Sequence, residues 1–293
     1  MKILLFLFLF FISIPLLHAE TNSLQTSEVE VLFEKHLANI ANDVAKVYPD
    51  VKDELIKSFQ WKGDFRPKVV LTSNRDAFRK IVGSEIIIAF AVPDKNLIVL
   101  DTSRVYTKPF TLETTLKHEL CHLLLHYNIE QARVPRWFDE GLCQWASGGI
   151  AELMTGDEER ALAKATISDR LIDIRELERF PMDEKSLILA YEESRSIVEY
   201  IVSEFGNQKI LQMLEYLKEG DSVNESISKS LSISLFELEK KWYAHIKRKY
   251  TWFSYLSNNL YTILFALAAL ITIYGFIRLL KKKREYKDEE EDE

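Results

Sequence analysis

The stretch Thr111–Tyr127, TLETTLKHELCHLLLHY, predicts the most informative helix of the chain. Its leucines at positions 112, 116, 120, 123 and 124 recur every three or four residues, which is the spacing of one face of an α-helix. Thr111 is a residue type that caps helix N-termini, and Glu113 places a negative charge in the first turn, where the helix dipole favours it. The pattern predicts a helix that begins after Thr111 and buries one face.

Within this helix lies His118-Glu119-Leu120-Cys121-His122, an H-E-x-x-H sequence. His118 and His122 are about 40° apart around the axis and one turn apart along it, so both imidazoles can bind one ion. Glu119 falls beside them, where a carboxylate can take a proton from a water molecule at the open coordination position. The pattern therefore predicts a zinc site of the kind found in metal hydrolases.

Zinc needs a third protein ligand, and His126 continues the same face by one more turn. It stands about 12 Å from His118 along the axis, which is too far when metal–nitrogen bonds are about 2.0–2.1 Å long. We expect His126 either to pack in the interior or to contact a ligand without binding the ion. The segment Pro135–Leu142, PRWFDEGL, offers Glu140, which follows His122 by 18 residues, enough for a loop and a returning helix.

The two segments together resemble the gluzincin branch of the metallopeptidases, in particular the peptidase-MA-like family. That family pairs H-E-x-x-H with W-x-x-E-G on the next helix, and the resemblance extends over roughly residues 65–248. It implies a zincin-like catalytic domain in which one Zn²⁺ is held by His118, His122 and Glu140. It also implies that Glu119 is the general base, and that Trp137 and Gly141 pack the ligand helix against the first.

The resemblance bears on two further points of the chemistry. In such enzymes a tyrosine from a later helix often supports the oxyanion, and Tyr191 is the position we would test. Tyr127 and Tyr200 compete for this role, and packing between helices is the alternative for each of the three. Gluzincin aminopeptidases carry a G-x-M-x-N strand, which this sequence lacks, so endopeptidase action is favoured.

The residues before the zinc motif predict a small mixed or antiparallel sheet with one or two helices. Val29–Val47 has a helical period that Tyr48-Pro49-Asp50 should end. Three short apolar runs predict strands, the last two forming a hairpin around Pro93–Asn96: Lys68–Leu71, Ile86–Val92 and Leu97–Leu100. After Thr111 the periodicity is almost entirely helical, with Gly206 and Gly220 as helix ends.

An apolar segment lies near each end of the chain. Met1-Lys2 followed by Ile3–Leu17 is typical of a secretory signal, which is either removed or kept as an anchor. The run from Leu260 to Leu280 is long enough to cross a hydrocarbon core about 30 Å thick, and a basic flank begins at Lys281. Because the segment after a signal is exported, we expect residues 20–258 outside the cytoplasm and the C-terminus inside.

The sequence thus predicts an α+β protein with a mostly helical catalytic part and one C-terminal transmembrane helix. Its expected segments are a signal peptide (1–19), an N-terminal α/β subdomain (20–105), a helical metallopeptidase subdomain (106–250), a transmembrane helix (259–280) and an acidic cytoplasmic tail (281–293). We expect the block Asp288–Glu293 at the end of this tail to be disordered, because its charges are of one sign.

Charge and cysteine content exclude some classes of protein. A net charge of −7 and a pI near 5.6 argue against a nucleic-acid-binding surface, which needs a basic face. Cys121 and Cys143 are too few for a disulfide framework. Since they lie on the two predicted ligand helices, they are either small buried thiols or a disulfide pair.

These patterns predict a membrane-anchored zinc peptidase that acts on peptide or protein substrates outside the cytoplasm. The alternative is a non-catalytic, membrane-anchored binding or assembly factor that retains the fold. Glu119 argues against this alternative, since a purely structural zinc site needs no base beside an open position. The sequence does not specify an oligomeric state.

Overall fold

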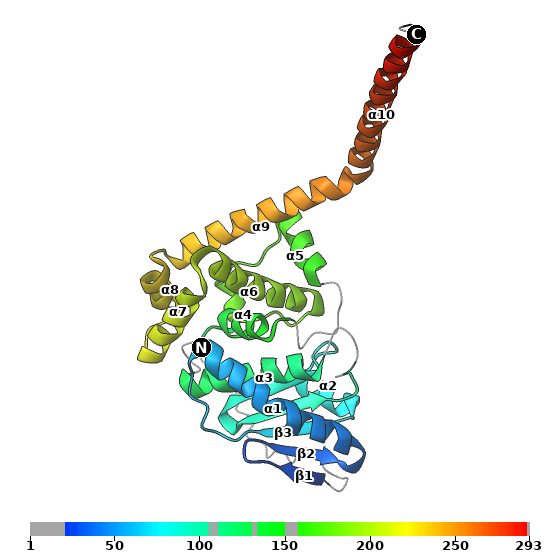
Figure 1. Ribbon diagram of the computed structural model, residues 1–293. Coiled ribbons are helices and arrows are strands. Elements are labelled where there is room, and N and C mark those ends of the chain that lie inside the picture. The colour runs from blue at the N-terminus through cyan, green and yellow to red at the C-terminus, as the bar shows by residue number, and fades with distance from the viewer. Residues whose placement is uncertain (1–20, 105, 107–110, 131–133, 150–157, 292–293) are drawn as a thin grey trace. The chain divides into compact units, whose positions relative to one another are not determined.

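A computed structural model describes residues 21–104, 106, 111–130, 134–149 and 158–291 of the chain (Figure 1). The predicted signal peptide, residues 1–19, lies outside the described residues. The chain divides into two compact units, Met1–Trp242 and Tyr243–Glu293.

The N-terminal part of the first unit is a five-stranded mixed sheet of order β1-β2-β3-β5-β4. Its strands are β1 (Thr21–Gln25), β2 (Glu30–Glu34), β3 (Lys68–Thr72), β4 (Ala89–Val92) and β5 (Leu97–Asp101). The three inner strands run parallel, whereas β1 and β4 pair antiparallel at the two edges. The predicted small sheet and its hairpin, which turns through η2 (Pro93–Lys95), are confirmed.

Different helices cover the two faces of this sheet. Val70, Val99 and Phe90 are cross-strand neighbours on one face, where they pack with Phe78 of α2 (Arg75–Val82). The alternate residues point to the other face, which α1 (Ala38–Phe59) and α3 (Leu112–Asn128) cover. On β4 these alternate residues are alanines, Ala89 and Ala91, and their small side chains allow α3 to pack against the edge strand.

The prediction of one helix over Val29–Val47, ended by Pro49, is wrong at both ends. Residues 30–34 form strand β2, which pairs with β1 and β3 and is followed by η1 (Lys35–Leu37). Helix α1 then runs through Pro49, because Tyr48, Val51 and Leu55 bury its inner face on either side. That packing outweighs the roughly 3 kcal/mol cost of an interior proline. Sequence reasoning missed β1 and α2.

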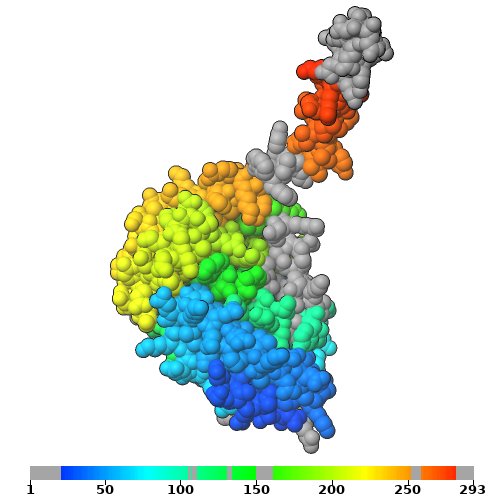
Figure 2. Space-filling view, in the orientation of Figure 1, coloured from blue at the N-terminus to red at the C-terminus, as the bar shows by residue number. Residues whose placement is uncertain are grey.

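The described part of the first unit after Thr111 is mostly helical, as the periodicity predicts. Its helices after α3 are α4 (Arg136–Ser147), α5 (Glu158–Ile167), α6 (Glu184–Phe205), α7 (Asn207–Glu219) and α8 (Val223–Leu231), and α9 (Leu235–Asn258) begins in this unit. Gly206 and Gly220 end α6 and α7 as predicted. In the space-filling view the blue sheet-and-helix part and the green to yellow helices pack together without a break (Figure 2).

The second unit contains α10 (Leu260–Glu291). Among the described residues, Leu260–Lys281 is the one helical segment long and apolar enough to cross a membrane, with a mean hydropathy of 2.3. The helix continues to Glu291, so the expectation of disorder is wrong for residues 288–291. Lysine, arginine and glutamate have high helix propensity, and they can extend a helix that is already nucleated.

Candidate metal centre

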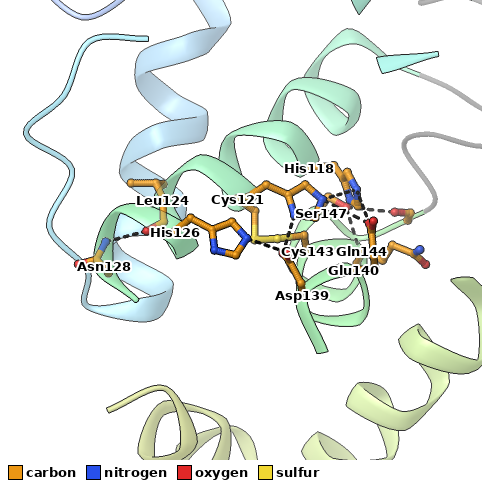
Figure 3. The surroundings of a disulfide bond; sticks show 12 residues. His118, Cys121, Leu124, His126, Asn128, Asp139, Glu140, Cys143, Gln144 and Ser147 are labelled. Atoms are coloured by element: carbon orange, nitrogen blue, oxygen red, sulfur yellow. Dashed lines mark hydrogen bonds and ion pairs between the residues drawn. A yellow bond between two sulfur atoms is a disulfide. The ribbon is translucent and has the colours of Figure 1, made fainter. Parts of the chain in front are cut away.

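Helices α3 and α4 bring the three predicted metal ligands together. Figure 3 labels two of them, His118 on α3 and Glu140 on α4. Thr111 caps α3 by accepting a hydrogen bond from the Thr114 N–H, as the sequence predicts. On α3 the Nε2 atoms of His118 and His122 are 3.1 Å apart. From α4, Oε2 of Glu140 lies 3.7 Å from Nε2 of His118 and 3.4 Å from Nε2 of His122. All three side chains are buried.

The spacing of these three donor atoms fits zinc. Ligand atoms about 2.0–2.2 Å from a tetrahedral ion lie about 3.3–3.6 Å from one another. The distances found, 3.1, 3.4 and 3.7 Å, bracket this range. Two imidazole nitrogens and one carboxylate oxygen are also a donor set that zinc takes in hydrolases, with one coordination position left open. His118, His122 and Glu140 would therefore hold the ion.

A further carboxylate, which sequence reasoning missed, orients one of these histidines. Asp139 Oδ1 lies 2.6 Å from Nδ1 of His122, and Oδ2 lies 2.7 Å from Nε2 of His126. Burial alone would raise the pKa of Asp139, but the His122 charge and the hydrogen bonds from both histidines lower it to about 2. Because an ionised carboxylate only accepts, both imidazoles donate to it. The available sequence signal was an acidic residue beside Glu140 on a buried helix.

The two oxygens of Glu140 face different partners. Oε2 faces the histidines, whereas Oε1 lies 3.5 Å from Nε of Arg136, whose guanidinium is 4.5 Å from the Phe180 ring centroid. Burial would raise the pKa of Glu140, but the His122 charge, the histidine hydrogen bonds and Arg136 hold it well below its usual value.

The acidic residues have the opposite effect on His122. Burial lowers the pKa of His122, but Asp139 and Glu140 outweigh this and raise it well above its ordinary value. The surroundings of this imidazole thus favour a positive charge. A divalent cation can take the place of that proton when it binds.

The centre opens into a cleft of about 750 Å³. Glu119, His122 and Glu140 line it, and so do Ala89 and Ala91 of the edge strand. Glu119 is fully buried within the protein, so it is screened from bulk water.

Of the three candidate tyrosines, Tyr191 lines this cleft. Its ring is buried and packs edge-on against Phe180, with centroids 5.0 Å apart. Tyr127 lines a neighbouring cavity instead and packs against Phe65. Tyr200 packs against Phe205. The fold therefore brings Tyr191, from α6, to the same cleft as Glu119.

Cys121 and Cys143 form a disulfide that joins the two ligand helices (Figure 3). Their Cα atoms are 5.4 Å apart, and both residues are fully buried. Cys121 directly precedes His122, and Cys143 lies less than one turn after Glu140. Of the two alternatives left open by the sequence, the pair is therefore the disulfide, and it links α3 to α4 close to the ligands.

Gly141 packs against a different helix from the one that the resemblance implied. A Cβ atom at Gly141 would lie 2.3 Å from the carbonyl oxygen of Ser194 and 3.0 Å from Cγ2 of Val198, both on α6. The glycine therefore lets α4 approach α6, not α3. The expectation that Gly141 packs the two ligand helices together is wrong, because the glycine lies on the α6-facing side of α4.

Two carboxyl groups, the buried Glu193 and the partly buried Glu239, hold the segment that leads to one wall of the cleft. The Ile172 N–H donates to both oxygens of Glu193, at 3.0 and 3.2 Å, and the Ile174 N–H donates to Glu239 at 2.8 Å. This segment continues into η4 (Glu176–Glu178), and Glu178 lines the cleft. Burial and the nearby Glu239 charge raise the pKa of Glu193 to about 8, against the opposing hydrogen bond from Ile172.

One of three comparisons with known proteins identifies a family. The Peptidase MA superfamily profile matches residues 82–248, more than half of the chain. None of the curated proteins compared with the chain matches it. Among solved structures, a mutant M1 zinc metallopeptidase from Deinococcus radiodurans is similar, with 14% identity and a TM-score of 0.44. That match covers 76% of this chain and 50% of the other, so this chain spans about half of the other's length. The profile match confirms the resemblance found in the two motifs: the chain belongs to the peptidase MA superfamily.

Proposed function

We propose that the protein is a membrane-anchored zinc-dependent peptidase that hydrolyses peptide bonds outside the cytoplasm. The observation that carries this proposal is the convergence of His118, His122 and Glu140 beside a cleft that His122, Glu140 and Glu119 line. The donor spacing suits one zinc ion, and family membership points to peptide substrates.

The roles of the residues follow from their positions. A bound zinc ion supplies a Lewis acid that makes water acidic and polarises a carbonyl group. Glu119 takes the proton from the attacking water and later passes it to the leaving amine, so no covalent intermediate is needed. Tyr191, which lines the same cleft, donates a hydrogen bond from its hydroxyl group to the oxyanion as it forms.

The edge strand β4 is suited to bind an extended peptide. The Asp101 N–H donates to the Ile88 carbonyl at 2.8 Å, so these two residues form a hydrogen-bonded pair of the β4–β5 ladder. Since such pairs alternate along antiparallel strands, the backbone groups of Ala89 and Ala91 point away from β5 toward the open edge. Both alanines line the cleft, where a substrate strand could pair with them.

Endopeptidase action is the finer part of the proposal. Ala89–Val92 carries no acidic residue that could hold a substrate's free amine, and an extended peptide can pass along an open sheet edge in both directions. The cleft does contain Glu178, which could bind an amine. Peptides with acetylated N-termini separate the two modes: internal cleavage supports an endopeptidase, and a strict need for a free amine identifies an aminopeptidase.

The zinc mechanism is tested on the purified full-length chain. We expect peptide cleavage to stop with a chelator and to return with zinc. Glu119→Gln should keep its zinc but lose about three orders of magnitude in turnover, because the proton acceptor is gone. A Tyr191→Phe enzyme with unchanged turnover would remove Tyr191 from the mechanism. A wild-type protein that binds zinc but cleaves nothing in a broad peptide library would favour the non-catalytic alternative.

Two observations support the membrane anchor and the side of the membrane. Segment Leu260–Lys281 of α10 has the length and composition of a membrane span. The Cys121–Cys143 disulfide suits an oxidising compartment, since cytoplasmic thiols are kept reduced. Protease added to intact cells should therefore digest the first unit and spare a tag at the C-terminus. Digestion of the tag alone would reverse the proposed orientation.

A further inference from the structure

Helix α3 carries a third histidine, His126, one turn beyond His122. Its side chain is 4% exposed, and Nε2 lies 2.7 Å from Oδ2 of Asp139. The other oxygen of that carboxylate accepts from Nδ1 of His122 at 2.6 Å. Asp139 is therefore held at both oxygens by two histidines of the same helix, and only one of these histidines reaches the metal centre.

This arrangement decides which nitrogen of His122 can bind a metal ion. A neutral imidazole carries its proton on one nitrogen and a lone pair on the other. Because Nδ1 donates to Asp139, the lone pair of His122 is on Nε2, the atom that lies 3.4 Å from Glu140 Oε2 and 3.1 Å from His118 Nε2. A carboxylate behind a ligating histidine also fixes the plane of its ring.

His126 supplies what Asp139 needs to stay in this position. A carboxylate bound at only one oxygen can rotate about its χ2 torsion, which has a broad energy minimum. The second hydrogen bond, from His126, removes that freedom. It also ties the end of α3 to the first turns of α4, the two helices that carry the ligands.

We propose that His126 is a positioning residue: by holding Asp139 it fixes the tautomer and ring plane of His122 and so strengthens zinc binding by His118, His122 and Glu140. The inference rests on the proposed zinc site, but its failure can be told apart from failure of that site. If His126 merely fills space, the shape of its side chain matters and its hydrogen bond does not.

Two substitutions separate these roles. His126→Phe keeps the size of the ring and removes the donor. His126→Gln loses the ring but keeps an amide N–H near the place of Nε2. His36→Phe is the matched control, because His36 lies on the surface with its side chain 57% exposed. Zinc affinity is measured on full-length protein in detergent by competition with a chromophoric chelator, together with the rate of zinc loss and the melting temperature of the metal-free form.

We expect His126→Phe to weaken zinc binding about 10- to 100-fold and to speed zinc loss, while His126→Gln stays within about threefold of the wild type. The control and the metal-free melting temperatures should not change. Wild-type affinity in His126→Phe, or equal loss in both variants, overturns the proposal. A wild-type protein that binds zinc no better than His118→Ala overturns the zinc site itself.

A measurement on the wild-type protein covers the case in which His126→Phe does not fold. Nitrogen-15 spectra of the histidine rings in the zinc-loaded protein report which nitrogen carries each proton. We expect His122 protonated on Nδ1 and His126 protonated on Nε2. A His126 ring without a proton on Nε2 cannot donate to Asp139, and that result also overturns the proposal.

Discussion

Helix α4 has two faces that are held to their neighbours in different ways. Toward α3 it presents Asp139, Glu140 and Cys143, which form hydrogen bonds, ligand contacts and a disulfide. Toward α6 it presents Gly141, which has no side chain and allows contact with the Ser194 backbone. The residues that face α3 form the candidate metal centre, and the glycine that faces α6 sets where α4 lies in the fold. Adjacent residues of one helix therefore form the centre and fix its position.

The largest effect is expected on the α3 side. Glu140→Gln replaces a charged ligand by a neutral amide, so we expect zinc affinity to fall more than about 100-fold and peptidase activity to fall with it. Isothermal titration with zinc measures the change. Glu199→Gln on α6 is the control, because Glu199 pairs with Arg195 at the surface, where ion pairs contribute little. Unchanged zinc binding in Glu140→Gln would show that Glu140, on the α3-facing side of α4, is not a zinc ligand.

The next effect lies on the α6 side and depends on pH. Glu193 has a folded-state pKa of about 8 and an ordinary value of 4.5, so between these pH values the folded chain holds a proton that the unfolded chain releases. The stability present at low pH is therefore lost as pH rises through this window, by on the order of 4 kcal/mol. Urea unfolding of the wild type and of Glu193→Gln at pH 4.5 and pH 8 measures it.

The glutamine isostere can still accept the hydrogen bond from Ile172 without becoming charged. We therefore expect Glu193→Gln to become more stable relative to the wild type as pH rises toward 8. Equal pH dependence in the two proteins would show that Glu193 is already ionised in the fold.

The disulfide should contribute somewhat less to the stability of the fold than the protonation of Glu193 does. Cys121 and Cys143 are 22 residues apart, and a cross-link over a loop of this length stabilises the fold by about 3 kcal/mol in the chain-entropy account. We expect the double variant Cys121→Ala/Cys143→Ala to lose about this much in urea unfolding, with no further loss on adding a reductant. If the wild type unfolds at the same urea concentration with and without reductant, the bond does not form.

The smallest effect is expected from the steric contact. Gly141→Ala places a methyl group 2.3 Å from the Ser194 carbonyl oxygen, so α4 and α6 must separate, at a cost of about 2 kcal/mol. The matched control is Gly149→Ala, because the nearest atom to its added Cβ is Thr114 Cγ2 at 4.0 Å. Equal stability of the two variants would mean that α4 and α6 can separate at little cost in free energy.

The fold could be predicted best where the local sequence alone determines the secondary structure. Helix α3, its Thr111 cap and the β4–β5 hairpin follow from short-range patterns. Residues 30–34 could not be assigned in this way, since their apolar spacing also suits a helix. Strand β2 forms there because β1 and β3 lie on both sides of it, and no local pattern reveals those neighbours. Pro49 was misjudged for the same reason, because distant packing holds α1 together.

By itself, the sequence determined the His118, Glu119 and His122 arrangement, since a spacing of one helical turn places two imidazoles together wherever the helix lies. The family motif singled out Glu140 as well. Only the tertiary structure decided that Asp139 links His126 to His122, that Gly141 faces α6, and that Tyr191 reaches the cleft. These contacts join residues on different helices, and their distances depend on how the helices pack rather than on their spacing in the chain.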